Sequence, residues 1–177
     1  MTPIELPVEL LSRIEDAGLN ASAPPQQRWV DGWLVRFSPG KAQRARCINA
    51  VAPGRLALSE KLAVCQALYR SAGLRLLLRI TPFSQPPGLD DWLAQRGYQR
   101  FGDTRVMVCP TLPRHPAEPL ADGIRFESAD SEAYAHIIGE FRDTALSGRQ
   151  AHAERLKHSP VPYQGMLLRS VDGAVLA

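Results

Sequence analysis

Residues 44–55 read RARCINAVAPGR and decide the fold prediction, because they join a strand pattern to a helix pattern. Residues 44–51 predict a strand, and the Pro-Gly pair at 53–54 ends it. A helix is expected next, since Ser59 is a favourable N-cap residue and an apolar stripe continues to Gly73. Residues 74–81 alternate in the manner of a further strand. Strands that alternate with helices predict an α/β fold of the α+β sandwich type.

The rest of the first region supports this pattern. An amphipathic helix is expected from Leu6 to a stop at Gly18, and strands are expected over 29–37 and 103–109. A short helix over 89–96 completes the set. Helices are therefore expected to flank a mixed, mostly antiparallel sheet.

A proline-rich linker over 110–119 divides the chain into residues 1–109 and residues 120–177. The second region shows strand patterns at 123–127 and 163–169 around helix patterns at 134–141 and 150–157. An Asp-Gly turn at 172–173 then predicts a return strand over 174–177. The net charge changes from +5 over residues 1–112 to −2 over residues 113–177, which also favours two units.

Composition excludes several classes of protein. With 177 residues, 45% of them hydrophobic and 22% charged, the chain is long and apolar enough to fold around a core. No apolar run approaches the ~20 residues of a membrane span, and the start shows no signal-peptide pattern. The three cysteines form no C-x-x-C pair and are expected as small core residues in a reducing, cytoplasmic setting. The histidines lack metal-ligand spacing, so no metal is expected.

The order of elements in the second region resembles the opening of a GNAT-superfamily N-acyltransferase domain. The first region resembles the later part of the same fold: residues 48–55 lead into the Ser59 helix, and Gly97-Tyr98 closes the short helix as Gly-Phe does in the family. Residues 33–36, 44–51 and 89–98 together resemble GNAT proteins that carry two such domains in tandem.

The resemblance implies transfer of an acetyl group from acetyl-CoA to an amine, either a small molecule or a peptide. In the family, a glycine-rich loop holds the pyrophosphate through backbone N–H groups. Residues 55–60 read Arg-Leu-Ala-Leu-Ser-Glu and contain no glycine, and Leu93 stands where the family has a tyrosine. Residues 1–109 are therefore expected to be a degenerate copy. Residues 120–177 would be the front part of a second, incomplete unit, whose phosphate loop would lie beyond Ala177.

No residue is assigned to catalysis or to cofactor binding. In GNAT domains the first two helices wall the acceptor site, so the resemblance offers Glu140, Phe141, Arg142 and Tyr163 as substrate-contact candidates. The alternative for Phe141 is core packing, and for the charged pair it is a solvated helix surface.

Two other functions stay open. The chain could be a catalytically silent interaction module, which dimerises through the open strand at 174–177. It could also bind nucleic acid through the basic residues between 28 and 46. The latter is disfavoured, because Trp29, Trp33 and Phe37 share strand parity with Val35 and are expected on one buried face.

Overall fold

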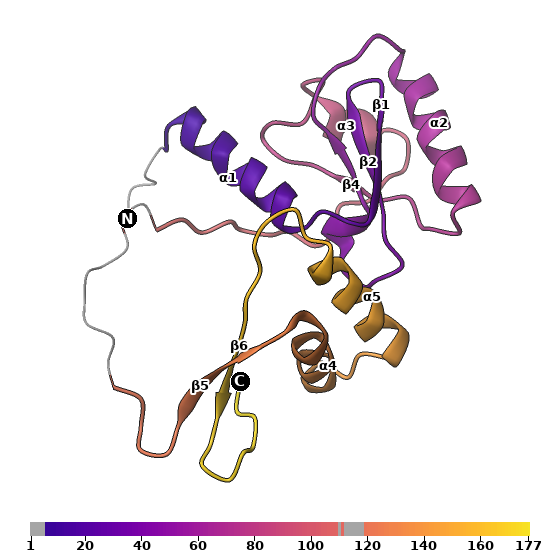
Figure 1. Ribbon diagram of the computed structural model, residues 1–177. Helices are drawn as coiled ribbons and strands as arrows, with labels where there is room; N and C mark the ends of the chain where they lie inside the picture. Colours follow the sequence, from indigo (N-terminus) through magenta and orange to yellow (C-terminus); the bar gives the residue numbers. More distant parts are fainter. Residues whose placement is uncertain (1–5, 110, 112–118) are drawn as a thin grey trace.

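The computed structural model describes residues 6–109, 111 and 119–177 (Figure 1). The first region contains α1 (Val8–Ala21), β1 (Gln26–Val30), β2 (Trp33–Phe37), a 3-10 helix (Gln43–Arg46), β3 (Ile48–Ala50), α2 (Leu58–Ser71), β4 (Leu78–Arg79) and α3 (Leu89–Ala94). The second contains β5 (Arg125–Ala129), α4 (Ser131–Phe141), α5 (Leu146–Lys157) and β6 (Gly165–Arg169). One sheet has the order β1-β2-β3-β4, with only the β3–β4 pair parallel, and β5-β6 form another. The expected mixed, mostly antiparallel α+β architecture is confirmed.

A hairpin replaces the single strand that was expected over 29–37. Asp31 and Gly32 adopt φ angles of 43° and 86°, which are the positive values that a two-residue type I′ turn requires. Because Trp29 now lies opposite Leu34, it faces away from Trp33 and is 62% exposed, whereas Trp33 is fully buried. The prediction that Trp29 shares the buried face was therefore wrong.

The main core lies on one face of the four-stranded sheet, beneath α2 and α3. Trp33, Val35 and Ile48 from the sheet pack there against Leu62, Cys65 and Tyr69 of α2 and Leu89 and Leu93 of α3. The Tyr69 hydroxyl donates a hydrogen bond of 2.8 Å to the backbone oxygen of Arg36, so α2 is tied to β2 by a polar contact too.

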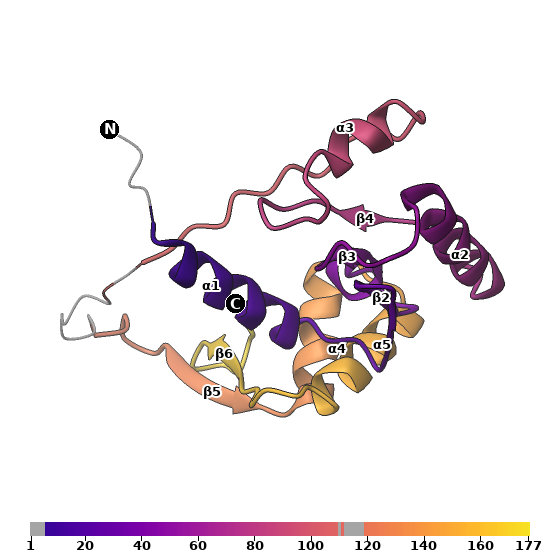
Figure 2. The same cartoon turned by 90° about the horizontal axis from the view of Figure 1, so that it is seen from above.

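On the opposite face of the sheet lie Leu34, Arg36, Asn49 and Arg79. Helix α1 covers this face (Figure 2). The buried guanidinium of Arg36 donates to the carbonyl of Leu19, at 2.8 Å, and Ser22 Oγ donates to the carbonyl of Gly18. These bonds satisfy carbonyls of the last turn, which allows α1 to continue through Gly18 to Ala21 instead of ending at the glycine.

Several elements are shorter or longer than their sequence patterns predicted. The strand expected over 44–51 is a 3-10 turn followed by only Ile48–Ala50, and the one expected over 74–81 is reduced to Leu78–Arg79. Helix α2 begins one residue before Ser59, and the Ala57 N-cap makes no side-chain bond, so the predicted serine cap was wrong. Residues 103–109 form no strand, because no described strand lies beside them.

The second region follows its predicted order. Helix α4 is capped by Asp130, which accepts a bond of 2.8 Å from the backbone N–H of Ala133, and β5 pairs antiparallel with β6. The return strand expected over 174–177 is reduced to an isolated antiparallel bridge between Val175 and Arg169. Beside it, Leu176 N–H donates to Leu168, and Leu168 N–H donates to Ala177, both at 2.8 Å. Most of the expected linker, residues 110 and 112–118, lies outside the described residues. No described helix has the length and apolar character to cross a bilayer.

The tight turn at Gly32 yields a stability prediction. A Cβ atom there would lie 2.7 Å from the carbonyl oxygen of Ala52, whereas at Gly88, with a similar φ of 77°, it would meet nothing within 4 Å. Gly88→Ala should therefore cost only the backbone penalty of about 1–2 kcal/mol. Gly32→Ala should cost at least about 1 kcal/mol more, because the overlap adds to that penalty. Urea unfolding followed by tryptophan fluorescence measures both losses of stability. Equal losses would contradict the tight contact.

Candidate functional site

The loop before α2 holds a carboxylate of this chain itself. Asp31, in the β1–β2 turn, accepts hydrogen bonds of 2.8–2.9 Å from the backbone N–H groups of Arg55 and Leu56. Its Oδ2 also lies 3.0 Å from the ammonium of Lys61 in the first turns of α2. Successive backbone N–H groups in a turn favour an anion, and here the loop that leads into α2 bonds to a side chain twenty-four residues earlier in the sequence.

The side chain of Lys61 contacts both Asp31 and the loop before α2. Its side chain is fully buried, and Nζ donates to the carbonyl oxygens of Asp31, at 2.7 Å, and Pro53. The ammonium also lies 5.2 Å from the centre of the Trp33 ring. Gly54 permits the close approach, because its φ is 73° and a Cβ would collide with Asp31 and Lys61. We call Asp31, Lys61 and the loop 53–56 the Asp31 clamp.

The clamp strongly favours the ionised form of Asp31. The N–H groups of Leu56 and Arg55, with a smaller contribution from Lys61, lower the pKa of Asp31 from 3.8 to about 2. Both N–H groups and the ammonium are therefore already bonded to an anion. Any further anion at these two N–H groups would have to displace a carboxylate that the protein itself supplies.

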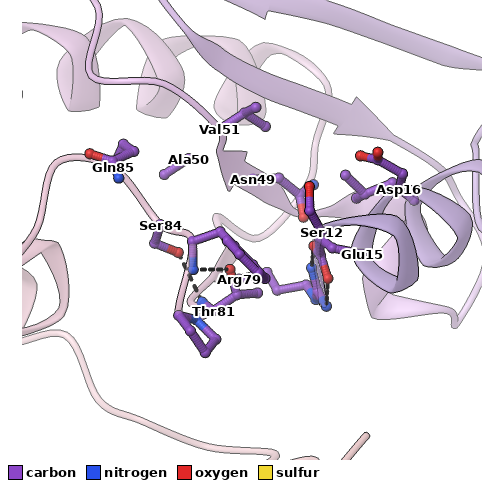
Figure 3. A pocket seen from close by; sticks show the side chains of 13 residues that line it. Ser12, Glu15, Asp16, Asn49, Ala50, Val51, Arg79, Thr81, Ser84 and Gln85 are labelled. Atoms are coloured by element: carbon purple, nitrogen blue, oxygen red, sulfur yellow. Dashed lines mark hydrogen bonds and ion pairs between the residues drawn. The ribbon is translucent and has the colours of Figure 1, made fainter. Parts of the chain in front are cut away.

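A cavity of about 360 Å³ opens on the other face of the sheet, between α1, the end of β3 and residues 81–85 (Figure 3). Arg79 of β4 and Glu15 of α1 form a bidentate ion pair across it, with 2.9 Å between Nη2 and Oε2. The Glu15 carboxylate raises the pKa of Arg79. Because these two charges neutralise each other, the guanidinium is not free to bind an anion.

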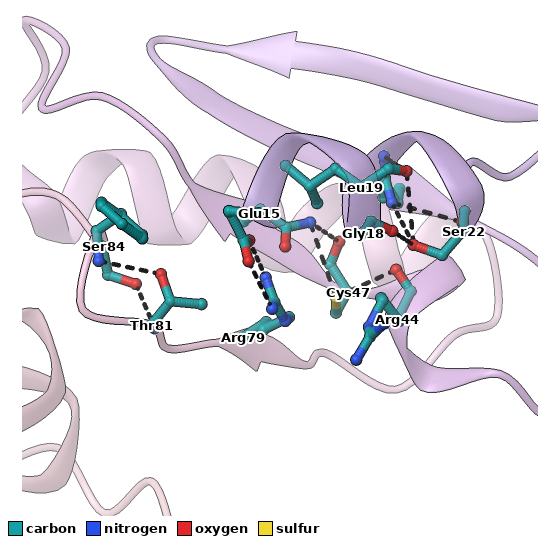
Figure 4. Close-up of polar contacts among 12 residues, drawn as sticks. Glu15, Gly18, Leu19, Ser22, Arg44, Cys47, Arg79, Thr81 and Ser84 are labelled. Atoms are coloured by element: carbon teal, nitrogen blue, oxygen red, sulfur yellow. Dashed lines mark hydrogen bonds and ion pairs between the residues drawn. The ribbon is translucent and has the colours of Figure 1, made fainter. Parts of the chain in front are cut away.

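Asn49 lines this cavity, and Figure 4 shows Cys47, two residues earlier in the chain, beside Arg44. Asn49 is buried and bonds weakly to the carbonyl of Cys47, at 3.4 Å, while its Oδ1 has no partner among the described atoms. Burial raises the pKa of the neighbouring Cys47 thiol, which keeps it protonated and unreactive. Cys47 and Cys65 are core residues as expected, but Cys109 is exposed, so that part of the prediction was wrong.

The four substrate-contact candidates do not gather into one site. Glu140 pairs with Arg149 of α5 at 2.8 Å, and Phe141 is 57% exposed at the end of α4, not in a core. Arg142 is exposed and faces α5, where its charge is one cause, after burial and Arg155, of the lowered pKa of His152. Tyr163 packs edge-on against Tyr134, with ring centres 5.6 Å apart. Tyr134 lies seven residues before Phe141, or roughly 10 Å along the helix.

Sequence reasoning missed the residues that the structure singles out. Asp31-Gly32 is an Asp-Gly pair between two apolar runs, which is a strong hairpin signal, and it was overlooked inside a supposed single strand. No local pattern links Asp31 to Lys61, or Glu15 to Arg79, because 30 and 64 residues separate the partners. Comparison of the chain with protein-family models, with curated proteins and with solved structures finds no match.

The clamp predicts a specific pH dependence of stability. Because the folded-state pKa of Asp31 lies below its ordinary value of 3.8, its contribution is present above pH 3.8 and is lost as pH falls towards 2. Asp31→Asn should therefore lower the urea midpoint at pH 6, and its difference from wild type should shrink across that acid range. Asp122→Asn, which removes an exposed carboxylate in the second region, is the control and should change little at any pH. A constant difference for Asp31→Asn down to pH 2 would argue against the clamp.

Proposed function

We propose that residues 6–109 act as a catalytically silent, GNAT-like interaction unit that does not use acetyl-CoA. The observation that carries this proposal is the Asp31 clamp, in which an internal carboxylate occupies the backbone N–H groups of Arg55 and Leu56. In the GNAT family that the sequence resembles, the corresponding loop must offer free backbone N–H groups to the pyrophosphate of the cofactor. A second negative group, Glu60, stands in the first turn of α2.

A second feature supports the absence of acyl-transfer chemistry in this unit. Leu93 occupies the position of the tyrosine that stabilises the departing thiolate in the family, and its side chain is 4% exposed in the main core. It has no polar atom and packs under the sheet with Leu89 and Tyr69. Tyr69 does not replace it, because its hydroxyl is bonded to Arg36 and burial raises its pKa.

Acetyl transfer to an amine acceptor by residues 119–177 is the competing proposal, and it has less support. A general base for an ammonium nucleophile must reach the proton that it removes. Glu140, the carboxylate among the candidates, is engaged with Arg149, and Tyr163 lies towards the other end of α4. We therefore favour the interaction role for the chain as described.

Titration of the intact chain with acetyl-CoA tests the proposal. Isothermal titration calorimetry should detect no micromolar binding, because Asp31 occupies the N–H groups of Arg55 and Leu56 in the loop before α2. Inorganic pyrophosphate should raise the thermal midpoint of Asp31→Ala more than that of wild type, since this variant frees both N–H groups. The Asp122→Asn variant controls for a general effect of lost negative charge. Micromolar binding of acetyl-CoA to the wild-type chain would overturn the silent role.

A further inference from the structure

Strand β1 forms an outer edge of the four-stranded sheet, with β2 on its other side. In a hairpin with a two-residue turn, Val30 and Trp33 form the first hydrogen-bonded pair, and such pairs alternate along the strands. The N–H groups of Gln26, Arg28 and Val30 therefore face β2. Those of Gln27 and Trp29 point outwards, so the edge offers two regularly spaced donors and their matching carbonyls to another strand.

A hollow of about 380 Å³ lies directly beside this edge. It is lined by Gln26, Gln27 and Arg28 of β1, Phe37 of β2, and Leu68, Ser71 and Ala72 at the end of α2. An extended peptide added to a sheet edge sends alternate side chains to the same face. One set would thus enter the hollow between β1 and α2, and the other would lie beside Trp29, which is 62% exposed.

Residues 103–109 have the pattern of a strand but pair with no other strand among the described residues. Their sequence, Asp-Thr-Arg-Val-Met-Val-Cys, has a strand pattern, yet no backbone–backbone hydrogen bond joins residues 99–109 to any described residue. Val106 is 58% exposed and Met107 is 93% exposed. An extended segment with unpaired backbone groups and exposed apolar side chains is a strand without a sheet.

Residues 103–109 are poorly placed to pair with β1 of the same chain. It follows α3, which follows β4, and β4 is the edge of the sheet opposite β1. From α3 the segment runs past α1 and away from β1 (Figures 1 and 2). A second copy is free of this constraint, since its segment can approach β1 from outside.

We propose that two copies of this chain exchange strands, with residues 103–109 of each added to β1 of the other. Thr104, Val106 and Val108 enter the hollow beside α2, where Leu68 and Phe37 provide apolar contacts. Met107 then lies on the side of Trp29, and a thioether against an indole ring is favourable. The same register keeps Arg105 on the opposite face from Arg28, so the two cations do not meet.

Reciprocal exchange closes the assembly as a twofold dimer, because each chain gives one strand and receives one. The interface supplies a partner for the interaction unit proposed above, on which this inference rests. Its test needs no acetyl-CoA. Binding of that cofactor would overturn the silent role and leave the dimer in place, whereas a monomer would overturn only the exchange.

Two proline variants test the exchange by sedimentation equilibrium of the intact chain. Trp29→Pro removes an outward N–H and no bond to β2, and Trp29→Ala is its matched control for the lost side chain. Val106→Pro acts on the donated segment, where it breaks no bond within the described chain. Wild type should dimerise with a micromolar dissociation constant. Each proline should raise this constant by at least about tenfold, and Trp29→Ala should raise it by less.

Mixing the two proline variants gives the sharpest result. A Trp29→Pro chain can still donate residues 103–109, and a Val106→Pro chain can still receive them on β1. Their mixture should therefore form a heterodimer through one exchanged strand, although each variant alone is monomeric. Circular dichroism verifies that both variants fold, and the fluorescence of the remaining tryptophans is compared with that of Trp29→Ala. The proposal would be overturned if the wild type is monomeric or if neither proline weakens the dimer. It would also be overturned if Val175→Pro breaks the dimer and Trp29→Pro does not, which would assign the interface to residues 174–177.

Discussion

The buried ammonium of Lys61 is the constraint on which the first region depends. An unpaired charge in a protein interior is very unfavourable, so its partners must stay in place wherever the fold holds. Here the partners are the side chain and carbonyl of Asp31 and the carbonyl of Pro53. Asp31 lies in the hairpin turn and Pro53 in the loop after β3, while Lys61 itself lies in helix α2. One cation thus joins the three segments that surround the main core.

The two faces of the sheet are held by different forces. On the α2 side, Trp33, Val35 and Ile48 are buried among apolar side chains, and the hydrophobic effect favours this arrangement without regard to direction. On the α1 side, Arg36 bonds to Leu19 and Arg79 bonds to Glu15, which fixes the helix by directional contacts. None of the α1 side chains is fully buried, so these polar contacts position the helix over the cavity.

Unsatisfied strand edges connect this architecture to the interaction role. The sheet stops at β1 on one side and at the two-residue strand β4 on the other, and residues 103–109 join no described strand. Asp31 occupies the N–H groups of Arg55 and Leu56, while the outward backbone groups of β1 stay open to a strand of another chain. The proposed interaction role uses this open edge.

The sequence alone determined those features that depend on near neighbours. The apolar stripe of α2 and the Asp-Gly turn at 172–173 were predicted correctly, because helix periodicity and the positive φ of Gly173 are local properties. The Asp31-Gly32 turn carried the same local signal, and its oversight placed Trp29 on the wrong face.

Only the tertiary structure decided which distant groups meet. That Asp31 would fill the N–H groups of Arg55 and Leu56 depends on the hairpin folding back over the loop after β3, which no spacing in the chain encodes. The lengths of β3 and β4 and the lack of a strand at 103–109 were set in the same way, since a strand exists only where another backbone lies within hydrogen-bonding distance. Burial of Lys61 likewise required partners that the fold alone brings together.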